Sequence, residues 1–142
     1  MKTINLAAYL TLIIAFLMLV VSGYWLLAPY TPIVFKDGPL QIENEGKTVK
    51  SGGYLSIFMD YCKYSKVAPE VNRTFSDGVL YDVPLIVASE KETGCNQVNL
   101  QVYVPRALPT GTYTLKSVYR YQVNPLRKID VTVETEPFTI TK

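Results

Sequence analysis

The stretch Gln97–Val104, QVNLQVYV, decides the fold because apolar and polar residues alternate along it without a break. A period of two is typical of a β-strand that buries one face and exposes the other. The same alternation recurs at Leu55–Asp60, at Tyr113–Val123 and at Ile129–Val133. We therefore predict that the chain around these segments folds as a β domain.

Turn-forming residues separate the alternating segments. They are Asp37-Gly38, Gly52-Gly53, Asp77-Gly78, Thr93-Gly94, Pro109-Thr110-Gly111 and Asn124-Pro125. Such combinations mark reversals of the chain. Segment 33–142 has roughly 110 residues and room for about seven or eight short strands, which predicts one two-sheet sandwich. No segment beyond residue 32 predicts a helix.

One late segment carries a resemblance to a known family. Leu108–Leu115, LPTGTYTL, resembles the entry to a late strand in bacterial and phage immunoglobulin-like domains. Its Tyr113 resembles the residue of the tyrosine corner, whose hydroxyl bonds the backbone at a turn between strands. The closing run 128–141 resembles the last strand of such a domain. Covering only the C-terminal third, the resemblance implies an all-β, immunoglobulin-like two-sheet sandwich.

The cysteines and the tryptophan depart from the antibody pattern, in which a core Trp packs on a disulfide between the sheets. We expect Cys62 to end a strand and Cys95 to lie in a turn, and Trp25 precedes the domain. The plan of one apolar segment followed by one small sandwich resembles phage and prophage envelope or virion proteins.

The segment Leu6–Leu27, LAAYLTLIIAFLMLVVSGYWLL, is almost wholly apolar and contains no charged side chain. Its length matches that of a helix crossing a bilayer core. A cleaved signal peptide, with Lys2 as its basic start, is the first alternative, but the apolar run is too long for a typical signal. A buried helix of a soluble protein is the second. We expect Tyr24, Trp25 and Tyr30 to lie at the membrane–water interface.

The orientation follows from the positive charge of the amino terminus and Lys2, because positive flanks stay cytoplasmic. We predict a cytoplasmic segment 1–5, a transmembrane helix 6–27, a linker 28–32 and a domain 33–142. The domain would be extracytoplasmic, in the periplasm, outside the cell or on a virion membrane. Pro29 and Pro32 stiffen the linker.

Cys62 and Cys95 are the only cysteines, and both follow the apolar segment. An exported domain meets oxidising conditions, which favour a disulfide between them. A pair of buried free thiols in a cytosolic domain is the alternative.

The residue types for most chemistry are missing. The chain has no histidine, which excludes Ser-His-Asp and Cys-His catalysis and the commonest transition-metal ligand. Gly52-Gly53 lacks the Lys-Ser/Thr that completes a phosphate loop. The net charge is only +2 and no basic stripe stands out, so a nucleic-acid partner is not expected. We predict no catalytic, metal-binding or cofactor-binding residue, and therefore no enzyme.

Two features point instead to contact with other proteins. The chain has 11 tyrosines, and some, such as Tyr103, fall on predicted outer faces, where tyrosine is enriched at interfaces. A β domain favours tyrosine in any case. Small residues also recur on one face of the apolar helix, where they would let a second helix approach closely: Ala8, Thr11, Ala15 and Ser22. Such residues are also simply common in spanning helices.

The last two strands predict a hairpin with one of two registers. The apolar residues of both strands are odd-numbered and must share the inner face. Paired residues therefore have numbers with an even sum. The shorter turn, Asn124-Pro125-Leu126, places Arg120 opposite Asp130 and Lys116 opposite Glu134. A turn two residues longer loses these charge pairs, so we favour the shorter one. Because the resulting outer face is charged, we expect a partner to bind elsewhere, at the loops or an edge strand.

The predicted function is that of a membrane-anchored, non-catalytic structural or interaction protein whose partners are the bilayer and another protein or further copies of itself. A phage virion or lysis-associated protein that links an assembly to the membrane is one alternative. A glycan-binding or small-molecule-binding module is another, since sandwich loops often carry such sites.

Overall fold

The computed structural model describes residues 6–36, 38, 40–87 and 93–142. The chain forms two compact units. The first comprises Met1–Tyr30 with Asn124–Arg127, and the second comprises Thr31–Val123 with Lys128–Lys142. The predicted cytoplasmic segment 1–5 lies outside the described residues.

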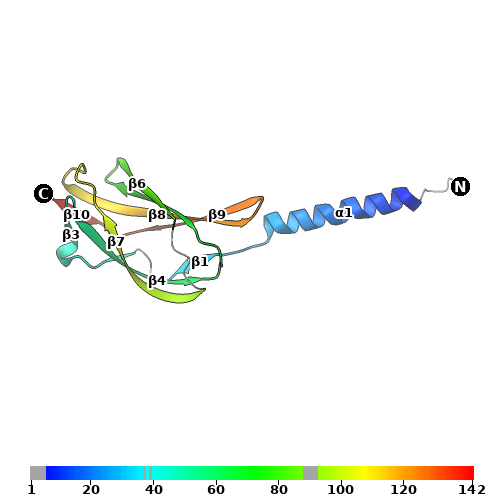
Figure 1. Cartoon of the computed structure of the whole chain (residues 1–142), viewed down its shortest axis with the longest axis horizontal. Coiled ribbons are helices and arrows are strands. Elements are labelled where there is room, and N and C mark those ends of the chain that lie inside the picture. The colour runs from blue at the N-terminus through cyan, green and yellow to red at the C-terminus, as the bar shows by residue number, and fades with distance from the viewer. Residues whose placement is uncertain (1–5, 37, 39, 88–92) are drawn as a thin grey trace. The chain divides into compact units, whose positions relative to one another are not determined.

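The first unit contains α1, which covers Leu6–Leu27 (Figure 1). It is the one helix in the described part of the chain that is long and apolar enough to cross a membrane. The last carbonyls of a helix have no partner within it. Here the Trp25 carbonyl accepts a 2.9 Å hydrogen bond from the Asn124 side chain, and the Ala28 carbonyl beyond the helix accepts one from Arg127.

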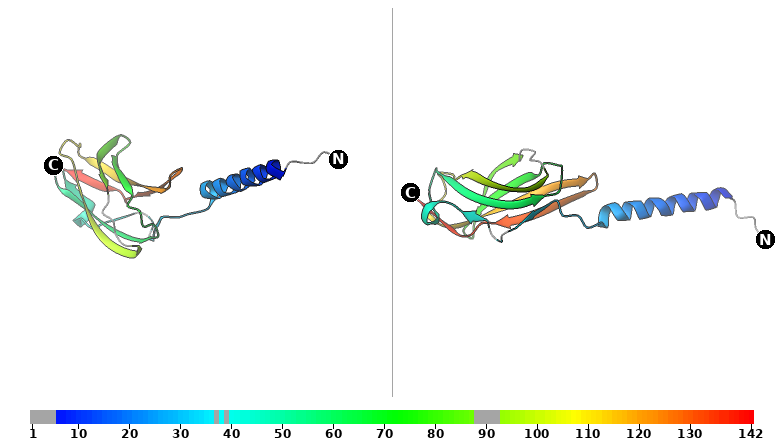
Figure 2. Two further views of the ribbon diagram at one scale, coloured as in Figure 1. Left: turned by 45° about the vertical axis from the view of Figure 1, so that its right-hand side comes forward. Right: turned by 90° about the horizontal axis from the view of Figure 1, so that it is seen from below.

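The second unit consists of two β-sheets, seen in two further orientations in Figure 2. The first sheet contains β1 (Ile33–Phe35), β2 (Gln41–Ile42), β4 (Tyr54–Lys63) and β7 (Gly94–Tyr103). The second contains β3 (Thr48–Lys50), β5 (Glu70–Ser76), β6 (Leu80–Val87), β8 (Gly111–Asn124), β9 (Arg127–Glu134) and β10 (Phe138–Thr141). A short 3₁₀ turn, η1, covers Glu45–Lys47.

Each sheet is built around one long strand. In the first sheet β4 pairs with β7 along its whole length, and also with the short strands β1 and β2. In the second sheet β8 pairs with β5, with β9 and with β10, while β6 pairs with β5. The first strand of that sheet, β3, runs parallel to the last, β10.

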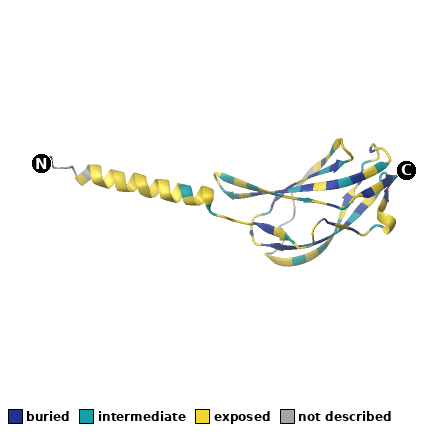
Figure 3. Ribbon diagram, turned by 180° about the vertical axis from the view of Figure 1, so that it is seen from behind, coloured by how far each residue is buried: buried dark blue, intermediate teal, exposed yellow. Residues whose placement is uncertain are grey.

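The core lies between the two sheets and follows the predicted alternation, which Figure 3 shows as buried and exposed residues taking turns along the strands. Leu55 and Ile57 of β4 and Leu115 of β8 are completely buried. Burying one such side chain stabilises a fold by about 1.5–3 kcal/mol. The largest buried side chains come from both sheets and are Tyr113, Tyr121, Phe75, Phe138, Leu55, Ile57 and Leu115.

The hydrogen bond implied by the tyrosine corner is present. The hydroxyl of Tyr113 donates to the carbonyl of Pro109 over 3.1 Å. Burial raises the pKa of Tyr113 to about 12, so the hydroxyl stays protonated and remains a donor. The contact fastens the loop before β8 to that strand.

The strands differ from the prediction in number and position. The described residues form ten strands rather than seven or eight, because the early edge strands are split into short pieces and Pro137 lies between β9 and β10. Cys95, which the sequence predicts in a turn, is the second residue of β7 because the pairing with β4 continues through Cys62 and Lys63, opposite Cys95 and Gly94. The turn between β8 and β9 is shortened to Pro125 and Leu126.

The charge pairs of the shorter hairpin register are both present. Arg120 donates two hydrogen bonds to the Asp130 carboxylate, of 2.9 and 2.8 Å. The Lys116 ammonium lies 3.8 Å from the Glu134 carboxylate. The outer side of this sheet is therefore a ladder of mixed charge.

Candidate interaction face

The outer side of β4 and β7 is the least charged sheet surface of the sandwich. Five cross-strand pairs follow one another along it: Tyr54 with Tyr103, Ser56 with Gln101, Phe58 with Asn99, Asp60 with Gln97, and Cys62 with Cys95. We define the open face as the uncharged residues of this ladder other than the cysteines, namely Tyr54, Ser56, Phe58, Gln97, Asn99, Gln101 and Tyr103. Alternation forces them outward because Leu55, Ile57 and Met59 face the core.

Two tyrosines form one end of the open face. The rings of Tyr54 and Tyr103 lie 5.6 Å apart between centroids, edge to face at 62°. Their side chains are nevertheless 58% and 45% exposed. Such a pair presents a rigid apolar surface with polar hydroxyl tips, which is the combination enriched where proteins meet.

Three side-chain amides form the middle of the open face. Gln97, Asn99 and Gln101 are exposed on β7. Each amide both donates and accepts hydrogen bonds. The whole of β7, GCNQVNLQVY, contains no charged residue. A partner binding here can therefore form directional hydrogen bonds without desolvating a charge.

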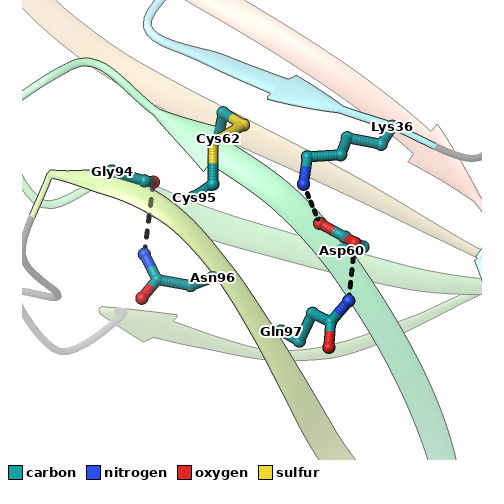
Figure 4. A network of polar contacts seen from close by, with 7 residues as sticks. All are labelled: Lys36, Asp60, Cys62, Gly94, Cys95, Asn96 and Gln97. Carbon is teal, nitrogen blue, oxygen red and sulfur yellow. Dashed lines mark hydrogen bonds and ion pairs between the residues drawn. A yellow bond between two sulfur atoms is a disulfide. The ribbon is translucent and has the colours of Figure 1, made fainter.

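A polar network closes the other end of the open face, as Figure 4 shows. The Asp60 carboxylate accepts a 2.8 Å hydrogen bond from Gln97 and lies 2.9 Å from the Lys36 ammonium. The hydrogen bond from Gln97 and then the contact with Lys36 lower the pKa of Asp60. The charge at this end is thus neutralised within the domain.

The disulfide between Cys62 and Cys95 lies next to this network (Figure 4). It joins two neighbouring strands of one sheet, with 3.9 Å between the Cα atoms. The antibody disulfide, in contrast, joins the two sheets. Here the bond fastens the start of β7 to the end of β4.

The outer side of the second sheet carries a groove of about 350 Å³. Its lining residues are Glu70, Asn72, Lys116, Val118, Arg120, Asp130 and Thr132. Lys116 and Arg120 are already paired with Glu134 and Asp130. The groove therefore has little unpaired charge with which to select a charged ligand.

The residues singled out on the apolar segment all lie on or next to α1. Ala8, Thr11, Ala15 and Ser22 are exposed on α1, and their packing against a second helix stays a prediction. Tyr24 and Trp25 are exposed in its last turn, and Tyr30 follows it. Their position at a membrane interface also stays a prediction.

Sequence reasoning placed Tyr103 outward but missed that Tyr54 lies against it. Alternation indicates the face of each residue, whereas the partner across the sheet depends on the register between strands distant in sequence. Arg73 was missed as well. It alternates with Val71 and Phe75 on the inner face of β5 and is only 6% exposed. Among the described residues no group of His, Cys, Asp and Glu could hold a metal.

No family model and no curated protein matches this sequence. Among solved structures, the alkylpurine DNA glycosylase AlkC of Pseudomonas fluorescens, bound to DNA with an abasic site analogue, is similar at 8% identity and a TM-score of 0.48. The similarity covers 87% of this chain but spans only 33% of the glycosylase chain. A Niemann-Pick type C2 protein from the Japanese carpenter ant is similar at 13% identity and a TM-score of 0.43, over 76% of this chain and 99% of that one. These likenesses assign neither a family nor a function.

Proposed function

We propose that this chain is a membrane-anchored, non-catalytic interaction protein that binds a protein partner outside the cytoplasm through the open face. The length and apolar composition of α1 support the anchor. The disulfide supports an oxidising compartment. The absence of histidine from the sequence removes the commonest general base and metal ligand.

We also propose that the domain has the immunoglobulin-like topology implied by the sequence resemblance. The chain changes sheets between β4 and β5, between β6 and β7, and between β7 and β8. Repeated crossing of this kind is typical of the Greek-key connections of such sandwiches. The hydrogen bond from Tyr113 to Pro109 supports the same topology.

The observation that carries the proposed function is the exposed ring pair of Tyr54 and Tyr103 beside a row of uncharged amides. The buried centres of protein interfaces are depleted of charge and enriched in aromatic residues. Exposing two rings in edge-to-face contact to water brings the isolated domain little stability. A partner that covers them would gain the burial of both rings.

Co-purification from gently solubilised membranes tests the proposal. The full chain should retain a stoichiometric protein partner, and the double variant Tyr54→Ala/Tyr103→Ala should lose it. The matched control is Lys116→Ala/Glu134→Ala, which removes a pair from the charged face and should retain the partner. Loss of the partner only in the control variant, or a monodisperse full chain with no partner, would contradict the proposal.

A glycan-binding or small-molecule-binding module is the second candidate, favoured by the groove on the second sheet. It predicts a chain that purifies without a protein partner and binds sugars, and that loses binding in Asn72→Ala rather than in Tyr54→Ala. A phage virion or lysis-associated tether would be a special case of the first proposal, with a phage protein as the partner.

A further inference from the structure

The strand β7 forms an edge of the first sheet. All ten of its residues are in register with β4 on one side. On the other side no described strand pairs with it (Figure 1). A sheet edge presents unpaired N–H and C=O groups, which form a template for another strand.

The long edges of the second sheet are protected, whereas that of β7 is not. Natural edge strands are protected by proline, by charge or by irregular pairing. In β6, Asp82 and Pro84 lie on the edge, and the register with β5 shifts between Val71 and Arg73. Charged residues alternate along much of β9, RKIDVTVE. In β7 there is no proline, no charge and no shift in register.

The pairing with β4 determines which backbone groups of β7 point to the open edge. Directly opposed residues of antiparallel strands are closer when they do not exchange hydrogen bonds, at about 4.5 Å rather than 5.5 Å between Cα atoms. The Cα atoms of Cys62 and Cys95 are 3.9 Å apart, so these residues form a pair that does not exchange backbone hydrogen bonds. Just beyond β7, Val104 does bond across the sheet, donating to the Gly53 carbonyl and accepting from the Gly52 N–H.

The odd-numbered residues of β7 therefore direct their backbone N–H and C=O groups outward. Among them are Gln97, Asn99 and Gln101, whose side chains also belong to the open face. A strand added here would form a regular ladder of backbone bonds and would meet a row of amides on the same face.

We propose that β7 pairs antiparallel with β7 of a second copy of this chain, joining the two first sheets into one continuous sheet. A two-fold axis brings the same surface of both copies together, so that surface must be complementary to itself. Amides meet this condition because each donates and accepts, whereas a row of like charges would repel its copy. The inference does not depend on the protein partner proposed above.

Self-complementarity also selects a register. The odd-numbered residues of β7 have the outward backbone groups, and their side chains lie on the open face. An odd-numbered residue of one copy must therefore pair with an odd-numbered residue of the other, so that the two residue numbers have an even sum. Placing Asn99 opposite Asn99 of the second copy sets Gln97 opposite Gln101 and Val98 opposite Leu100. All three amides of each copy then face an amide, and the two partly buried apolar residues face each other. The two neighbouring registers that keep an even sum are shifted by two residues, and each leaves an amide facing a cysteine or a tyrosine.

Cysteine crosslinking of the full chain in detergent or in membranes tests both pairing and register. Asn99→Cys should form a covalent dimer on mild oxidation, since opposed strand residues lie within disulfide reach. Gln101→Cys is the matched control. In the proposed register its copies are four residues apart along the strand, about 13 Å at roughly 3.3 Å per residue, so it should not crosslink. Peptide mapping would verify that Cys62 and Cys95 remain paired.

A charge on the edge gives an independent test. Asn99→Lys should weaken self-association about tenfold or more, because two ammonium groups would meet at the axis. Thr132→Lys, on the charged face, should leave it unchanged, and both variants should unfold at similar urea concentrations. Association that survives Asn99→Lys but is lost in Ala15→Ile would overturn the proposal in favour of α1 packing. A chain that stays monomeric and uncrosslinked at micromolar concentration would overturn it too.

Discussion

The outer faces of the two sheets differ in charge although both cover the same core. The face of β5, β8 and β9 is a ladder of opposite charges, including the bidentate pair of Arg120 and Asp130. The open face on β4 and β7 has amides and exposed rings instead. Folding requires only that outward residues be polar enough for water, so it does not dictate this difference. We infer that one face is adapted to solubility and the other to contact.

The long edge strands of the two sheets also differ in how far they are protected against pairing with another strand. On the second sheet, β6 has a proline and β9 has charges, whereas β7 on the first sheet has neither. An unprotected edge is a liability for a protein that must stay monomeric. The proposed pairing with a second copy would use this edge, which lies beside the open face.

The largest expected effect comes from removing the disulfide that fastens β7 to β4. Cys62→Ala/Cys95→Ala opens a loop with a sequence separation of 33 residues. We expect the free energy of unfolding to fall by about 3–4 kcal/mol on the chain-entropy model. Urea unfolding of the full chain in detergent, followed by circular dichroism, measures it. Alkylation of both cysteines in the unreduced wild-type protein would show that the bond does not form.

The ring pair on the open face should be coupled more strongly than its exposure suggests. A double-mutant cycle of Tyr54→Ala and Tyr103→Ala should give a coupling energy of about 0.5–1.5 kcal/mol. Added salt should leave this coupling unchanged because it is not ionic. A coupling energy of zero would mean that the rings are held apart in solution and present no common surface.

The ion pair on the charged face should be weaker and sensitive to salt. A double-mutant cycle of Arg120→Ala and Asp130→Ala should give a coupling energy of roughly 0.2–1 kcal/mol. This coupling energy should decrease as salt screens the charges. A coupling larger than that of the tyrosine pair, and unaffected by salt, would reverse the comparison between the two faces.

Acid should affect both faces through their carboxylates. Hydrogen bonds from Arg120 and from Gln97 lower the pKa values of Asp130 and Asp60 respectively. A lowered pKa stabilises the fold above the unfolded value of about 3.9, and this contribution is lost as the pH falls through the folded value. Asp60→Asn and Asp130→Asn should therefore be less stable than the wild type at pH 7. These differences in stability should narrow as the pH falls below the unfolded value of about 3.9, and differences independent of pH would contradict this.

The smallest expected effect on the sandwich is that of Ala15→Ile in α1. We predict that it weakens association between spanning helices because a larger side chain prevents close approach. The urea midpoint of the β domain should not change. Crosslinking in membranes measures the association, and an unchanged yield would mean that the spacing of Ala8, Thr11, Ala15 and Ser22 is accidental.

The sequence predicted the parts of this molecule that depend on local periodicity. Alternation identified the buried faces of β4, β7 and β8, and the charge pairs of Arg120 and Lys116 identified the hairpin partners because those strands are adjacent in sequence. The pairing of Tyr54 with Tyr103 could not be predicted because it depends on a register between strands about 40 residues apart in the sequence. Nor could alternation show that β7 is an edge, since that is a property of the whole sheet.

Site-specific photocrosslinking in native membranes tests the central claim most directly. A photoreactive phenylalanine analogue would replace either Tyr54, on the open face and away from the β7 edge, or Thr132, on the charged face. We predict protein adducts from position 54 and none from position 132. Adducts from position 132 alone, or from neither position, would contradict the assignment of the open face as the contact surface.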